Sequence, residues 1–152
     1  NNLSEHFSNG IGLFLKGNVG TLKTSLAVAI AYKYISELGN DVKFLTMSSL
    51  VAAIFSNKIS SNDQFENDLK TVSLLILDDL GAENPERWIL SKIDAIISER
   101  YNRQLPTIFT TNLTNAEILK IYSQRICDRI RSSTVTINFS GDSLRTNNLL
   151  KK

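Results

Sequence analysis

The sequence has few of the residues that stabilise small domains through covalent or metal cross-links. It contains one cysteine, Cys127, and one histidine, His6. A single cysteine excludes an internal disulfide, and neither residue stands in a cluster with metal-ligand spacing, so we predict no structural metal. At 152 residues the chain is long enough to bury a core without such cross-links, and we expect one domain over residues 1–152.

Long apolar runs and an excess of one charge are also missing. No run approaches the roughly 18 residues that span a bilayer, and no signal peptide is visible, so we expect a cytoplasmic protein with no membrane segment. Lys and Arg number 17 against 15 Asp and Glu, so any contact with nucleic acid must be a local patch. Because the chain opens at Asn1 rather than at methionine, we expect a fragment that a further domain precedes.

Glycine is used at a distinctive place, between an apolar run and a helix of small residues. Residues 17–24 have the sequence GNVGTLKT, which is typical of a phosphate loop, in which backbone N–H groups converge at a helix N-terminus. Lys23 would reach the β and γ phosphates, and the Thr24 hydroxyl would ligate Mg²⁺. The alternative is an ordinary strand, turn and helix. The expected nucleotide-binding residues are Gly17, Asn18, Val19, Gly20, Thr21, Leu22, Lys23, Thr24 and Ser25.

One residue departs from the phosphate-loop pattern G-x-x-x-x-G-K-[ST]. Leu22 stands where glycine is expected before the lysine. A Cβ at this position forces a different backbone angle or crowds the phosphates. Since the lysine, the threonine and the downstream aspartates are retained, we expect nucleotide binding with weak, slow ATPase activity.

Two further polar groups follow apolar strands. Asp78 and Asp79 end the run LLILDD, where the carboxyl end of a buried parallel strand would lie beside the phosphate loop. Asp78 would hold Mg²⁺ through water, and Asp79 would orient or deprotonate the attacking water. Asn112 ends FTTN and would position the same water. The alternatives are two aspartates that merely end a strand and an asparagine that accepts a turn.

The rest of the pattern alternates strands and helices, which predicts an α/β sandwich with a mainly parallel sheet. We expect residues 1–9 to be a lead-in and residues 56–68 a loop with one helical turn near 65–69. The short helix at 48–55 would be capped by Ser48 or Ser49, and a capping box at Thr114 would open the last helix. The expected strands are 13–16, 42–46, 74–77, 107–111 and 135–139, and the expected helices are 23–38, 48–55, 86–102 and 114–132.

A basic run, QRICDRIR, lies in the last expected helix. Arg125 and Arg129 are four residues apart and therefore share a helix face. One interpretation is a solvated basic face or a local ion pair. The other is that one arginine reaches the γ phosphate held by a neighbouring subunit, since a planar guanidinium stabilises the charge of a transferring phosphoryl group.

Taken together, these motifs resemble a known family. GNVGTLKT, LLILDDLGAE, LPTIFTTN, RICDRIR and VTINFSGDSLR, in this order, are similar to the AAA+ ATPase domain of bacterial replicative helicase loaders of the DnaC and DnaI type. The resemblance covers residues 10–145 and extends to the IstB-like helper ATPases of transposition. It implies a three-layer P-loop NTPase fold with five parallel strands in the order 5-1-4-3-2, little or no helical lid, and ATP or ADP with Mg²⁺ as cofactors.

The resemblance also implies roles for individual residues and partners. Lys23 and Thr24 would bind phosphate and magnesium, Asp78 and Asp79 would be the Walker B pair, Asn112 sensor one, Arg129 the trans-acting arginine finger, and Arg145 sensor two. Such a loader acts in DNA replication, assembles with itself through the Arg129 face, and meets the replicative helicase through an N-terminal region that precedes this chain.

Family members bind single-stranded DNA, and two residues are local candidates for that contact. Phe55 would stack a base and Lys58 would meet a phosphate. The alternative is that Phe55 is the last core residue of its helix. Two other functions remain open: a helper ATPase of transposition, and a nucleotide-gated module in which Leu22 has abolished hydrolysis.

Overall fold

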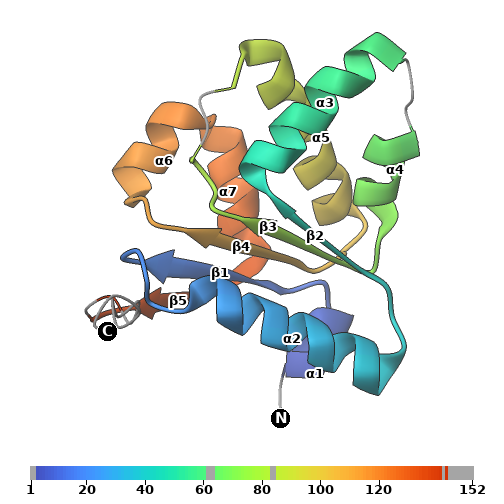
Figure 1. Cartoon of the computed structure of the whole chain (residues 1–152). Coiled ribbons are helices and arrows are strands. Elements are labelled where there is room, and N and C mark those ends of the chain that lie inside the picture. Colours follow the sequence, from blue (N-terminus) through green and yellow to red (C-terminus); the bar gives the residue numbers. More distant parts are fainter. Residues whose placement is uncertain (1–2, 61–63, 83–84, 142, 144–152) are drawn as a thin grey trace, which may run out of the picture.

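A parallel sheet forms the centre of the molecule, with helices on both faces (Figure 1). The structure, a computed structural model, describes residues 3–60, 64–82, 85–141 and 143. Within them the sheet has five strands in the order β2-β3-β4-β1-β5, and every neighbouring pair is parallel. This confirms the expected order. The strands are β1 (Gly12–Gly17), β2 (Val42–Thr46), β3 (Leu74–Asp78), β4 (Thr107–Thr111) and β5 (Thr134–Phe139).

Strand β3 forms where apolar residues run almost without interruption, and β4 combines an apolar centre with three threonines. Every residue of β3 and β4 is buried, because helices cover both faces of the sheet. Successive side chains point to opposite faces, so each strand contributes to two separate core clusters. One cluster includes Phe14, Leu75, Leu77 and Phe109, and the other Leu13, Leu15, Leu74, Ile76 and Ile108.

The helices divide unequally between the two faces (Figure 1). One face carries α1 (Leu3–Ser8) and α2 (Lys23–Leu38), and the other carries α3 (Met47–Ser60), α4 (Gln64–Thr71), α5 (Arg87–Asn102), α6 (Asn115–Ile121) and α7 (Gln124–Ser132). The bounds expected for α2, β2 and β4 are confirmed, as is the left-handed end of α2 at Gly39. Among the described residues, no helix is both long and apolar enough to cross a membrane.

Helix α1 corrects the expectation of an unstructured lead-in. Its residue Phe7 is buried, and the ring meets that of Tyr34 edge-on with the centroids 5.5 Å apart. The helix has only two apolar residues, Leu3 and Phe7, and Phe7 anchors it to the core against α2. Two apolar residues are too few to establish a periodic pattern, which is why the sequence did not predict the helix.

The region expected as a short helix and a loop is largely helical. Helix α3 continues to Ser60, and the single turn expected at 65–69 is part of α4. The cap was also placed wrongly: the Thr46 hydroxyl accepts a hydrogen bond from the Ser49 N–H at 3.1 Å, so Thr46, rather than Ser48 or Ser49, caps α3.

The last expected helix is two helices. Tyr122 is extended (φ −106°, ψ 152°), and the Ser123 hydroxyl accepts the Ile126 N–H to cap α7. The apolar spacing continues across the break, so periodicity alone did not reveal it. The capping box of Thr114 and Glu117 is confirmed at the start of α6, and Cys127 is buried as expected.

A buried arginine joins α4, α5 and β4. Arg100 is 1% exposed, and burial lowers the pKa of its guanidinium to about 10, so it stays protonated at neutral pH. Its Nε donates to Thr107 Oγ1 at 2.9 Å, and its Nη2 donates to the Pro106 carbonyl at 2.8 Å. Its Nη1 donates to the carbonyls of Leu69 and Val72 at 2.9 and 2.8 Å. All four of these hydrogen bonds are buried.

We predict that Arg100→Met lowers the free energy of unfolding by about 3 kcal/mol, because several buried acceptors lose their donor at once. Urea denaturation measures the change. Arg103→Met is the matched control: Arg103 is paired with Glu99 on the exposed part of the same helix end, and its loss should cost less than about 1 kcal/mol. Equal losses for the two variants would contradict the role given to Arg100.

Candidate functional site

The loop between β1 and α2 has the backbone of an anion-binding turn. Gly20 (φ 81°) and Leu22 (φ 65°) are both left-handed, and Thr21 between them has a negative φ. Alternation of this kind turns successive N–H groups toward one concave side. The loop lies at the carboxyl edge of the parallel sheet and leads into the N-terminus of α2, where the partial positive charge also favours an anion.

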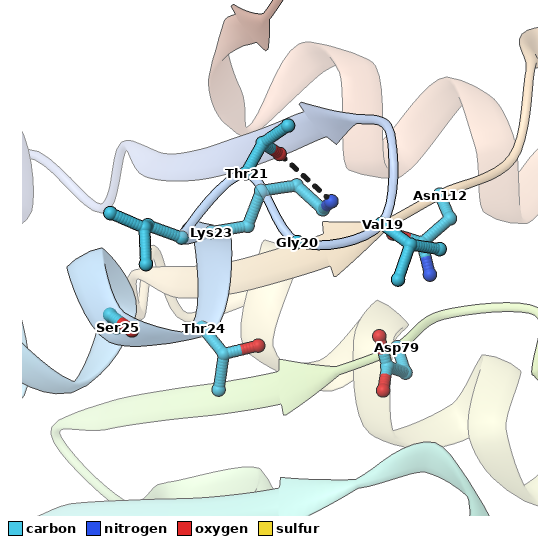
Figure 2. A pocket seen from close by; sticks show the side chains of 9 residues that line it. Val19, Gly20, Thr21, Lys23, Thr24, Ser25, Asp79 and Asn112 are labelled. Atoms are coloured by element: carbon cyan, nitrogen blue, oxygen red, sulfur yellow. Dashed lines mark hydrogen bonds between the residues drawn. The ribbon is translucent and has the colours of Figure 1, made fainter. Parts of the chain in front are cut away.

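Lys23 is held inside this loop. Its side chain is buried, and Nζ donates to the carbonyls of Gly17 and Asn18, each at 2.7 Å. Nζ also lies 3.4 Å from the Thr21 hydroxyl (Figure 2). The ammonium group is therefore placed at the centre of the turn, and it closes the loop by bridging its first two residues.

Beneath the loop, a buried carboxylate gathers two hydroxyl groups. Asp78 is 4% exposed, and its Oδ1 accepts from Thr24 Oγ1 at 2.9 Å and from Thr110 Oγ1 at 2.6 Å. The Thr110 hydroxyl in turn accepts the Asp79 N–H at 2.9 Å. Asp79 is left-handed (φ 58°), a conformation that aspartate tolerates better than most residues. The Thr110 contact therefore fixes Asp79 where β3 leaves the sheet.

A hollow of about 120 Å³ brings together the loop and the residues from the neighbouring strands. Figure 2 shows Thr24 and Asp79 facing the same space, with Asn112 beside Val19. This gathers most of the residues expected from the sequence, whereas Gly17, Asn18 and Asp78 do not line the hollow. The lining residues are Val19, Gly20, Thr21, Leu22, Lys23, Thr24, Ser25, Asp79 and Asn112.

Leu22 keeps a backbone conformation that favours glycine. The sequence left open whether its Cβ would change the backbone angle or crowd the phosphates. In the structure the residue is left-handed (φ 65°, ψ 19°), and its half-exposed side chain lines the hollow. The conformation costs a non-glycine residue about 1–2 kcal/mol.

Arg125 and Arg129 do not line the hollow. Arg129 donates to Asp94 Oδ1 at 3.0 Å and to the Ser98 hydroxyl, and Arg125 pairs with Asp94 Oδ2 at 3.0 Å. Within one copy of the chain Arg129 is therefore in an ion pair, but with an aspartate of α5 and not with a local partner in its own helix. The role of Arg129 toward a neighbouring subunit stays a prediction, and Arg145 lies outside the described residues.

Phe55 is not a core residue. It is 52% exposed, and its ring centroid lies 6.3 Å from that of Trp88, with the planes tilted by 40°. The two aromatic side chains come from α3 and α5, which lie on the same face of the sheet (Figure 1). Lys58 lies in α3, and its side chain is outside what the structure describes.

The sequence analysis did not predict three residues that contact the candidate site residues, namely Thr110, Asp94 and Trp88. Thr110 had a usable signal, because a polar side chain inside a fully buried strand needs a hydrogen-bond partner. No sequence signal marked Asp94 or Trp88, because their partners come from other helices and lie far away in the chain.

We predict that Thr110→Val destabilises the chain by about 1–3 kcal/mol, because Asp78 loses a donor and the Asp79 N–H loses its acceptor at almost unchanged volume. Thermal unfolding measures it. The control is Thr136→Val on the exposed edge strand β5, where we expect a change within about 0.5 kcal/mol. Indistinguishable midpoints for the two variants would contradict the proposed hydrogen-bond network.

Comparison with known proteins identifies an ATP-binding family, which agrees with the geometry of the loop. The profile of the family described as "IstB-like ATP binding protein" matches residues 5–152. The replicative helicase loader DnaC of Escherichia coli (strain K12) is 31% identical over 147 residues, covering 93% of this chain and 60% of DnaC. The replicative helicase loader DnaI of Bacillus subtilis (strain 168) is 32% identical over 127 residues, covering 76% of this chain and 38% of DnaI.

A solved structure of the DnaC helicase loader matches with a TM-score of 0.81 at 26% identity, covering 87% of this chain and 80% of that one. The chain spans about three fifths of the length of its DnaC relatives. The extent of the family match and the similarity to DnaC and DnaI agree with the AAA+ P-loop architecture of the sheet. The chain therefore belongs to the family of IstB-like ATP-binding proteins and is homologous to the replicative helicase loaders DnaC and DnaI.

Proposed function

We propose that this chain is the AAA+ domain of a replicative helicase loader, and that it binds ATP with Mg²⁺ and hydrolyses it slowly. The observation that carries the proposal is the convergence of the loop N–H groups, Lys23, Thr24, Asp79 and Asn112 on one hollow. Its volume suits phosphate groups rather than a whole nucleotide, so the base and ribose would lie outside it. Membership of an ATP-binding family supports the same ligand.

The residues beside the hollow suit a magnesium ion. The Thr24 hydroxyl donates a hydrogen bond to Asp78, so the lone pairs of the hydroxyl oxygen remain available to a cation. Hydroxyl, carboxylate and water oxygens are the ligands that Mg²⁺ prefers, and Asp78 would act through water. The ion would neutralise phosphate charge, while the Lys23 ammonium would bind the β and γ phosphates from within the loop.

For hydrolysis, the proposal assigns Asp79 and Asn112 to the attacking water. The Asp79 carboxylate would orient the water and take its proton, and the Asn112 amide would hold it in line with the γ phosphate. Arg129 of a neighbouring copy would stabilise the charge of the transferring group, and Arg145 would report the nucleotide state. Leu22 slows turnover because its side chain occupies the wall where the phosphates lie.

We predict that a fluorescent ATP analogue binds this chain with a Kd of about 1–10 μM in the presence of Mg²⁺. Lys23→Ala should weaken binding at least about tenfold by removing the buried cation. Leu22→Gly should tighten it about threefold, because glycine raises the fraction of loops in the left-handed conformation, whereas Leu22→Val should weaken it.

The same variants test hydrolysis through phosphate release. We expect slow release by this chain, faster release by Leu22→Gly, and none by Lys23→Ala. Binding by the glycine variant alone would mean that the domain is a scaffold that has lost its ligand. Release no faster than that of Lys23→Ala would remove the proposed ATPase activity.

The wider role is proposed from the relatives. DnaC and DnaI are named as replicative helicase loaders, and this chain would likewise act with a replicative helicase in DNA replication. Self-assembly would use the α7 face that carries Arg129. Single-stranded DNA would stack on the exposed ring of Phe55, beside the partly buried Trp88 of the adjacent helix, with Lys58 near a phosphate.

We predict that Phe55→Ala weakens binding of a labelled oligothymidylate by about fivefold or more, which is the lower range for loss of one stacked base. Fluorescence anisotropy with ATP and Mg²⁺ measures the affinity. Phe44→Ala is the control, because Phe44 is an exposed aromatic residue on the edge strand β2. Full affinity in Phe55→Ala would remove the stacking role.

Leu22 favours a second candidate, a nucleotide-gated switch that does not hydrolyse ATP. Equal affinity for ATP and a non-hydrolysable analogue, with no phosphate release, would support it. An IstB-like helper ATPase of transposition would share the same site, and the matching family is described as "IstB-like ATP binding protein". Its partner would be a transposase in place of a helicase, and a pull-down with each protein distinguishes the two when the expected N-terminal region is included.

A further inference from the structure

The end of strand β5 lies directly against the start of the phosphate loop. Strands β1 and β5 are parallel, and Gly17 is in register with Phe139. A Cβ built on Gly17 would lie 2.2 Å from the Phe139 carbonyl oxygen. The first residue of the loop therefore has no room for a side chain, because the end of β5 occupies that space.

A second contact lies deeper in the loop. A Cβ built on Gly20 would be 1.9 Å from the hydroxyl oxygen of Ser143 and 2.8 Å from its Cβ. Ser143 therefore covers the α-carbon of Gly20. Gly20 lines the hollow and Ser143 does not, so the serine supports the loop from outside the site.

Gly20 is also one of the two left-handed residues that shape the concave turn. Its φ is 81°, but glycine adopts positive and negative φ about equally well, so Gly20 could also take other backbone conformations. A neighbour packed on its α-carbon reduces that freedom. Ser143 is well placed to keep the N–H groups of the empty loop in the arrangement that an anion needs.

We propose that Ser143 is a positioning residue for the phosphate loop, which it holds in the nucleotide-binding shape by packing on Gly20. The inference rests on the proposed nucleotide binding. The coupling is reciprocal: if the Ser143 contact raises nucleotide affinity by some factor, bound nucleotide strengthens that contact by the same factor. Nucleotide binding would thereby be transmitted to the segment that follows β5.

A double-mutant cycle on this contact tests the proposal. Gly20→Ala introduces the clash with Ser143, and Ser143→Gly removes the two closest of the atoms with which it clashes, Oγ and Cβ. We expect Gly20→Ala to weaken binding of a fluorescent ATP analogue by about tenfold or more, and Ser143→Gly alone by about threefold. In the Gly20→Ala background, Ser143→Gly should restore about threefold or more, because only the 3.1 Å contact with the α-carbon of residue 143 and the strain of a left-handed alanine remain.

Ser143→Val provides a test without a change in the loop itself. Its extra methyl group presses on Gly20, so affinity should fall about fivefold, whereas Ser140→Val, at an exposed position three residues earlier, should leave affinity unchanged. Circular dichroism establishes that each variant is folded. Hydrogen exchange adds a second readout: nucleotide should slow exchange after β5 in the wild-type chain but not in Ser143→Gly.

The outcomes separate the inference from the function on which it rests. If the wild-type chain binds nucleotide but the Gly20 and Ser143 effects simply add, and Ser143→Val matches Ser140→Val, Ser143 does not position the loop. If the wild-type chain binds no nucleotide, the proposed function fails and the inference fails with it. Coupled effects, with slower exchange after β5 on binding, support it.

Discussion

The hydrogen bonds of the Asp78 carboxylate fasten the phosphate loop to the sheet. Thr24 at the start of α2 and Thr110 in β4 both donate to this carboxylate, which ends β3. A buried charge without donors is costly, so these three elements are held in one arrangement. Because Thr110 also holds the Asp79 N–H, the same contacts place Asp79 at the hollow.

Most of the backbone strain in the described residues lies at the same edge of the sheet. Leu22 and Asp79 are two of the three non-glycine residues with positive φ in the described part of the chain, and both line the hollow. Conformations of this kind persist only where the surroundings impose them. Here β3 and β4 are buried along their whole length, and they provide the rigid base from which the strained residues project.

Strong local signals made the centre of the fold predictable from the sequence. The apolar strands, the glycine that ends α2 and the capping box of α6 act over a few residues, so their elements were expected correctly. What was missed depends on distant contacts: α1 on the ring contact of Phe7, and the Arg129 environment on Asp94. The break between α6 and α7 leaves the apolar spacing intact, so no pattern marked it.

The two arginines that share Asp94 give Arg129 an unusual freedom. When a cation leaves a partly buried carboxylate, the negative charge is ordinarily left unpaired. The energetic cost of that unpaired charge opposes the loss of the cation. Arg125 binds the second oxygen of Asp94 independently, so the carboxylate retains a counter-ion when Arg129 swings away. Loss of the Arg129 contact would therefore leave Asp94 with one of its two cations, so the electrostatic cost at this carboxylate is smaller than in an isolated ion pair.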